Sequence, residues 1–116
     1  MAKSQPYLKA ETKIEQAKKS GAIELDLRSM ALTELPESIG QLTKLKKLAL
    51  GIDYSKKDRK QNQLTTLPES LGQLMQLTSL NISNNQLTAL PESLGQLQNL
   101  ERFDLYSNKL TSLPKF

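Results

Sequence analysis

The sequence contains few side chains of the kinds that carry out catalysis or bind metals. The 116-residue chain has neither histidine nor cysteine, which removes the usual zinc ligands and most pairs of a nucleophile with a base. Three glutamates, Glu37, Glu69 and Glu92, recur at equivalent places of a repeated block. Carboxylates spaced in this way indicate a solvated surface and not an acid–base pair. We therefore predict no enzyme activity, no catalytic or metal-binding residues and no cofactor.

Positive charge is concentrated in one stretch of the chain. Seven lysines and arginines lie between Lys44 and Lys60 against two aspartates, whereas the whole chain carries a net charge of +4. Within this stretch, one aromatic residue accompanies four cations: Tyr54, Lys56, Lys57, Arg59 and Lys60. The group predicts either a solvated loop without a partner or a contact to an acidic protein, an anionic ligand, nucleic acid or an acidic membrane surface. Of these partners, nucleic acid is the one we expect least.

The basic stretch interrupts a regular repeat. The block Pro-Glu-Ser-[Ile/Leu]-Gly-Gln-Leu occurs at residues 36–42, 68–74 and 91–97, and a further copy begins at Pro114. The prolines are separated by 32, 23 and 23 residues, so one repeat carries a nine-residue insertion at about 51–61. A repeat of this length predicts a solenoid in which each coil stacks on the next.

The repeats share the frame Leu-x-x-Leu-x-Leu-x-x-Asn-x-Leu, and one domain spans residues 1–116, with repeats at 22–44, 45–76, 77–99 and 100–116. The recurring leucines predict a continuous core, and each Leu-x-Leu predicts a short strand of a parallel sheet on the concave side. Asn62, Asn85 and Asn108 are predicted to bond the backbone of the turns that follow the strands. The proline-led blocks predict short 3₁₀ segments on the convex side.

Residues 1–21 lie outside the repeat and predict a helix that covers the first coil. Residues 7–19 are mostly good helix formers, and Ala10, Ile14 and Ala17, with Leu8 nearby, are spaced to line one helix face. Gly21 is placed to end the helix. A solenoid needs such a cover because its first coil has no preceding neighbour.

The repeat frame resembles leucine-rich repeats. Its Leu-x-x-Leu-Pro-x-x-[Ile/Leu]-Gly-x-Leu part resembles the intracellular 23-residue class of Ras-associated, bacterial and Roco-type proteins, and Ile14, Ala17, Gly21, Leu25 and Leu27 are similar to the start of many bacterial domains. The resemblance covers about residues 8–116. It implies an α/β right-handed solenoid of four coils, used as a scaffold that presents a surface to a protein partner. No GTPase motif accompanies it, so nucleotide hydrolysis is not implied.

The cellular setting is predicted from what the sequence lacks. Extracellular leucine-rich repeat domains generally close their ends with disulfide-bonded caps, and this chain has no cysteine. No apolar run near the start resembles a signal peptide, and none is long enough to span a membrane. We therefore expect a cytoplasmic protein.

The concave sheet face is the first predicted site for a protein partner. Strand positions beside the inward leucines form three rows that cross the sheet. The first row is Glu24, Lys47, Ser79 and Arg102; the second is Asp26, Ala49, Asn81 and Asp104; the third is Arg28, Gly51, Ser83 and Tyr106. The alternative is an ordinary solvated face. Arg102 and Tyr106 are the expected anchors of a partner, because such residues are enriched at binding hot spots.

The C-terminal coil is a further predicted contact. The chain stops at Phe116 within a repeat, so Phe103, Leu105, Leu110 and Leu113 are expected to be partly uncovered beside an unpaired strand edge. Such an edge favours pairing with another chain, so we expect either a homodimer through this coil or a chain that is a fragment of a longer array. Lys109, Lys115 and a frayed tail are the alternative protection for this end.

Overall fold

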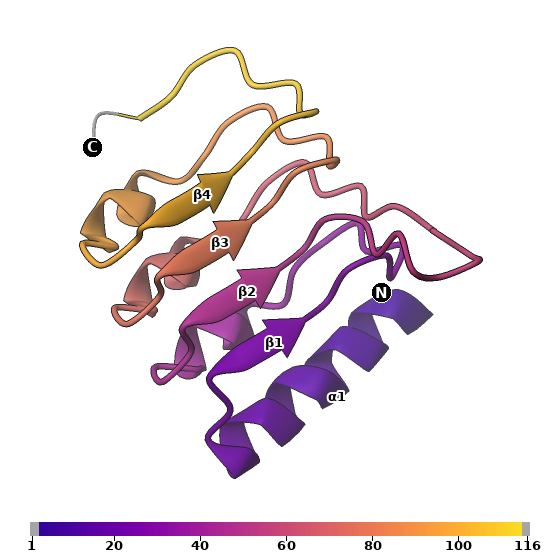
Figure 1. Cartoon of the computed structure of the whole chain (residues 1–116), viewed down its shortest axis with the longest axis horizontal. Helices are drawn as coiled ribbons and strands as arrows, with labels where there is room; N and C mark the ends of the chain where they lie inside the picture. Colours follow the sequence, from indigo (N-terminus) through magenta and orange to yellow (C-terminus); the bar gives the residue numbers. More distant parts are fainter. Residues whose placement is uncertain (1–2, 115–116) are drawn as a thin grey trace.

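The computed structural model describes residues 3–114 and shows a parallel sheet with 3₁₀ segments behind it (Figure 1). Four short strands lie in the order β1-β2-β3-β4, and they are β1 (Glu24–Asp26), β2 (Lys47–Ala49), β3 (Ser79–Asn81) and β4 (Arg102–Asp104). The chain returns between strands through 3₁₀ segments, which are η1 (Glu37–Gln41), η2 (Glu69–Gln73) and η3 (Glu92–Gln96). The predicted α/β solenoid is confirmed. Residues 1 and 2 of the predicted N-terminal cap, and Lys115 and Phe116 of the last repeat, lie outside the described residues.

The helix α1 (Gln5–Ser20) lies beside β1 at the N-terminal end of the sheet (Figure 1). It begins where the Ser4 hydroxyl accepts a hydrogen bond from the amide of Tyr7, and it ends at Gly21, whose φ of 66° is left-handed. Ala10, Ile14 and Ala17 are buried, as predicted. Leu8 is 41% exposed instead, because two residues correspond to about 160° around a helix, which turns Leu8 away from Ala10.

The core is a continuous stack of leucines. The strand register aligns the central residues Leu25, Leu48, Leu80 and Phe103. The three leucines are buried, whereas Phe103 in the last strand is only half-buried. Burying a leucine side chain stabilises the fold by roughly 1.5–3 kcal/mol, so a row of them in each coil compensates for the near absence of aromatic residues.

The predicted asparagines connect consecutive coils. The side-chain amide of Asn62 donates to the carbonyl of Leu50 in its own coil and to that of Leu27 in the preceding coil. Its oxygen accepts hydrogen bonds from the amides of Met30 and Leu32. Asn85 and Asn108 likewise donate to carbonyls of their own and the preceding coil. Each accepts from one amide, that of Leu64 or Leu87, and Asn108 is the less buried of the two.

Serine and glycine bring the 3₁₀ segments close together. The Ser70 hydroxyl donates to the carbonyl of Glu37 over 2.7 Å, and Ser93 donates to Glu69 over 2.8 Å. Each serine lies against the glycine of the preceding segment, where a Cβ on Gly72 would stand 2.5 Å from the carbonyl oxygen of Ser93. The repeated Ser-x-Gly spacing of the block thus sets how closely the coils approach on the convex side.

Within the described residues, no helix has the length and apolar composition that crossing a membrane requires. The same part of the chain contains no group of three or more acidic residues that are placed to bind a metal ion.

Candidate functional site

The concave face carries the predicted rows in register. Hydrogen-bonded partners align Glu24, Lys47, Ser79 and Arg102, and they align Asp26, Ala49, Asn81 and Asp104. These eight residues line a groove of about 540 Å³ together with Leu25, Leu48 and Arg28. We call this hollow the concave groove. Its middle consists of small side chains, Ala49 and Ser79 with Asn81, whereas both ends are charged.

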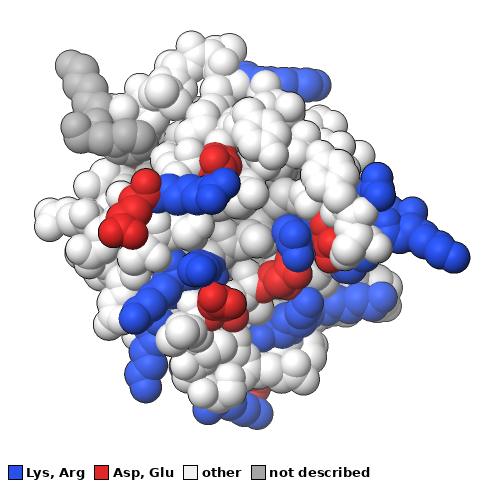
Figure 2. Space-filling view, viewed as in Figure 1, with Lys and Arg blue, Asp and Glu red and all other residues white. Residues whose placement is uncertain are grey.

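At each end of the groove, an acidic and a basic side chain form an ion pair. Glu24 lies 3.5 Å from the ammonium group of Lys47, and Arg102 lies 3.1 Å from Asp104 at the opposite end. Figure 2 shows acidic and basic side chains side by side over the strands. Because exposed pairs of this kind contribute little to stability, a partner can exchange them for its own charges at small cost.

Arg28 is held more firmly than the other cations of the groove. Its guanidinium makes two hydrogen bonds to the Asp26 carboxylate, of 2.9 and 3.0 Å, and lies 3.6 Å from Asp53. The side-chain hydrogen bond from Arg28 lowers the pKa of Asp26 from its ordinary value. For Asp53, hydrogen bonds from the hydroxyl and amide of Ser55 lower the pKa. Arg28 therefore connects the first strand to the inserted loop and is not a free anchor for a partner.

The third predicted row is wrong in its middle. Ser83 is fully buried and Gly51 is buried, whereas both were expected to face solvent. The Ser83 hydroxyl folds back to donate to the side-chain oxygen of Asn81 over 2.6 Å, and a Cβ on Gly51 would stand 3.1 Å from that hydroxyl. Tyr106, at the end of this row, is 59% exposed.

The inserted segment divides into a packed base and an exposed tip. Asp53 is only 8% exposed, and its amide donates to the Ser29 hydroxyl over 2.8 Å. Residues 54–61 are exposed, and the segment projects from the end of β2, where Figure 1 shows it extending beyond the other coils. The prediction of a projecting loop is confirmed for residues 54–61 and wrong for residues 51–53, which pack against the first coil.

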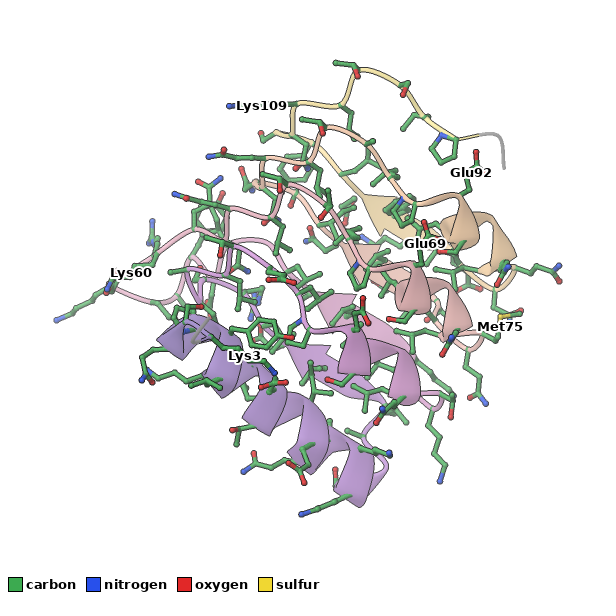
Figure 3. All side chains as sticks on the ribbon, turned by 180° about the vertical axis from the view of Figure 1, so that it is seen from behind. Lys3, Lys60, Glu69, Met75, Glu92 and Lys109 are labelled. Carbon is green, nitrogen blue, oxygen red and sulfur yellow. The ribbon has the colours of Figure 1, made fainter. Side chains whose placement is uncertain are left out.

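Arg59 stabilises the tip of the loop from within. Its guanidinium donates to the carbonyls of Tyr54 and Lys56 over 2.6 and 3.0 Å, and it lies 5.4 Å from the centre of the Tyr54 ring. Lys60 points away from the molecule in Figure 3 and lies 3.9 Å from Asp58. Of the four predicted cations, the exposed Lys56, Lys57 and Lys60 remain the better placed for an outside contact.

The contacts of Asp53 and Ser29 were missed in the sequence. The sequence does contain a signal for Asp53, because Asp53-x-Ser55 has the same spacing as Asn81-x-Ser83. In both pairs the side chain of the first residue accepts hydrogen bonds from the amide and the hydroxyl of the serine. Ser29 has no such pattern. Its left-handed φ of 52° belongs to the turn that follows β1.

The last coil is less covered than the others. Phe103, Leu105 and Leu110 are partly buried, and Leu113 is 61% exposed. The strand β4 stands at the end of the sheet order. The expectation of partly uncovered apolar residues is therefore confirmed for the described residues.

Comparison with known proteins agrees with this geometry. Residues 75–116 match the family model described as leucine-rich repeats in two copies. Among solved structures, a leucine-rich repeat protein of Leptospira interrogans is 32% identical over 86% of this chain, with a TM-score of 0.50, and YopM from Yersinia enterocolitica is 26% identical over 94%, with a TM-score of 0.68. The chain is a leucine-rich repeat protein. It spans 36% and 20% of the length of those two chains. No curated protein matches the sequence.

Proposed function

We propose that this leucine-rich repeat chain is a non-catalytic protein-interaction module that binds its partner in the concave groove. The observation that carries the proposal is the groove itself, which has a floor of small side chains and exchangeable ion pairs at both ends. A floor of this kind leaves room for the partner's larger side chains, and charges at the rim give orientation and selectivity.

The inserted loop supplies a second contact in this proposal. It leaves the groove at the end of β2, its base is fixed to the first coil by Asp53, and its tip is stiffened by the contacts of Arg59 with Tyr54. Figure 2 shows basic side chains projecting at the edge where this loop lies. A partner with an acidic region beside the segment that enters the groove fits both surfaces.

A matched pair of substitutions tests the groove. Ala49→Trp fills the floor, whereas Ala89→Trp adds the same side chain at an exposed position that does not line the groove. Both variants are immobilised and exposed to an extract of the source cells, and the bound proteins are quantified after the thermal stability of each variant is checked. We expect wild type and Ala89→Trp to retain the same protein, and Ala49→Trp to lose it at least about tenfold.

The same experiment distinguishes binding in the groove from binding of an anionic partner by the basic loop. A variant with Lys56, Lys57 and Lys60 replaced by alanine removes the exposed cations of the loop, and binding is repeated over a range of salt concentrations. Binding that survives Ala49→Trp, disappears in the triple-alanine variant and falls steeply with salt would replace the groove with the basic loop as the functional site.

A further inference from the structure

The centre of the concave groove presents hydrogen-bond donors. The side-chain oxygen of Asn81 accepts hydrogen bonds from the amide of Ser83 over 3.0 Å and from the Ser83 hydroxyl over 2.6 Å. A backbone amide can only donate, so the bond from Ser83 identifies which branch of the Asn81 side chain is the oxygen. Both hydrogen bonds that this side chain makes within the described residues therefore use its oxygen. Because Asn81 lines the groove, its NH₂ group, which is turned away from Ser83, can donate to a molecule that enters.

Two cations flank the serine that precedes Asn81 on the same face of β3. The strand register places Ser79 between Lys47 of β2 and Arg102 of β4, and neighbouring strands lie about 4.8 Å apart. The side chains of Lys47 and Arg102 are 62% and 76% exposed, and Figure 2 shows charged side chains around an uncharged area over the strands. Both cations can turn over Ser79, because exposed ion pairs hold them only weakly.

These groups favour an anionic group over a cationic one. The Asn81 oxygen already accepts two hydrogen bonds, and the Asp26 carboxylate accepts two from Arg28. Asp104 stands opposite Asn81 in the register and is bonded to Arg102 over 3.1 Å. A cation would therefore compete for acceptors that are in use, whereas a carboxylate meets donors at the centre and positive charge on both sides. Arg102 can bond Asp104 and a second carboxylate together, since a guanidinium carries several N–H donors.

We propose that the protein partner inserts an acidic side chain into the concave groove, where its carboxylate lies above Ser79 and accepts hydrogen bonds from Ser79 and Asn81. Lys47 and Arg102 supply positive charge on its two sides. This inference rests on the proposed function, to which it adds the chemistry of the bound group. The groove is lined by residues of β1 to β4, so a segment of the partner can cross it and continue on both sides. A side-chain carboxylate allows this path, whereas a terminal carboxylate does not.

A phage-display library of random dodecapeptides, each joined to its carrier at the C-terminus, tests this inference. Peptides that bind Ala49→Trp are first removed, and the remainder are selected on wild type, Asn81→Asp and Gln98→Glu. Asn81→Asp keeps an oxygen for Ser83 but replaces the NH₂ group with negative charge, whereas Gln98→Glu adds the same charge at an exposed position outside the groove. We expect wild type and Gln98→Glu to enrich Asp or Glu at one fixed position of the peptide. Asn81→Asp should select neutral or basic residues there.

The dissociation constants of synthetic copies of the enriched peptides give the size of the effect. A peptide selected on wild type should bind Asn81→Asp at least about tenfold more weakly and Ser79→Ala about threefold more weakly, because each change removes a donor. Ser79→Ala keeps the test decisive if Asn81→Asp lowers the thermal stability. Selected peptides that share no acidic residue, acidic peptides that bind both variants as tightly as wild type, or a library without any groove-dependent peptide would overturn the inference. The proposed function is judged separately, by retention of the partner from the extract.

Discussion

Arg28 and Asp26 form the tightest charged contact of the concave face, and they show how a repeat position acquires a structural role. In the regular third coil the equivalent residue, Ser83, bonds Asn81 of its own coil, and Arg28 takes this place in the first coil. Here its guanidinium reaches Asp53 of the insertion while it bonds Asp26 at 2.9 Å. One side chain thus fixes an irregular segment onto a regular scaffold. Contacts with residues of the first coil offset part of the conformational entropy that the base of the insertion loses on folding.

The Arg28 contact makes stability depend on pH in a defined direction. Because the pKa of Asp26 is lowered in the fold, its contribution is complete above the unfolded pKa of about 3.9 and is lost as the pH falls through the folded pKa. We expect Arg28→Gln to cost up to about 1 kcal/mol near neutral pH, with a difference from wild type that shrinks below about pH 4. Denaturant unfolding between pH 2.5 and 7 measures it, according to the usual linkage. The exposed Lys57→Gln serves as the control, and an equal pH dependence in both variants would contradict the assignment.

At the scale of the elements, the 3₁₀ segments determine the spacing of the coils. A glycine on one segment and a serine on the next allow their backbones to meet, and the serine hydroxyl donates to the carbonyl of the glutamate that begins the preceding segment. Figure 3 shows Glu69 and Glu92 beside successive segments on this side of the molecule. The proline-led block therefore works as a contact between coils as well as a turn within each coil.

Two glycines at equivalent positions should respond differently to the same change. In Gly72→Ala the new Cβ would stand 2.5 Å from the Ser93 carbonyl oxygen, so we expect a loss of roughly 1–3 kcal/mol from overpacking. Gly95 is exposed, and Gly95→Ala should stay within about 0.5 kcal/mol of wild type. Chemical denaturation measures both free energies of unfolding. Similar losses in the two variants would show that the glycines are needed for their own backbone conformation and not for the contact between coils.

At the scale of the whole molecule, the insertion is an addition to a regular repeat frame. Gly51 and Asn62 take the places of Ser83 and Asn85 in the next coil, between which only Asn84 stands. Asn62 still bonds the first two coils, so the frame continues correctly after the loop. The segment therefore changes the surface of the molecule and leaves the order of the strands unaltered.

Replacement of residues 52–61 by a single asparagine should leave a folded protein. Asparagine tolerates the left-handed backbone that Asn84 adopts at φ 58°. The lost contacts of Asp53 oppose the lower entropy cost of a shorter loop, so we expect the free energy of unfolding to change by less than about 1 kcal/mol. Circular dichroism should still show one cooperative transition. As a control of equal length, residues 54–60 are exchanged for glycine and serine; loss of the transition in the shortened variant alone would make the insertion structural.

The repeat pattern predicts the fold because the same spacing of leucines recurs in each repeat. The rows of residues on the concave face follow from strand alternation, and the register confirms them at Glu24, Lys47, Ser79 and Arg102. The burial of Ser83 and the engagement of Arg59 depend on local contacts, of Ser83 with Asn81 and of Arg59 with the carbonyls of Tyr54 and Lys56. Such contacts arise from the path of individual turns, which no period in the sequence describes.

The matching faces of successive coils also bear on how such a gene can change. The segment η2 meets both of its neighbours through the same glycine and serine positions, so it presents one kind of contact to the coil before it and to the coil after it. Duplication or loss of a whole coil by unequal recombination would preserve this glycine–serine contact at the new junction. The length of the array is therefore open to selection independently of the stability of its core, and surface residues of a copied coil can diverge while its leucines hold it in place.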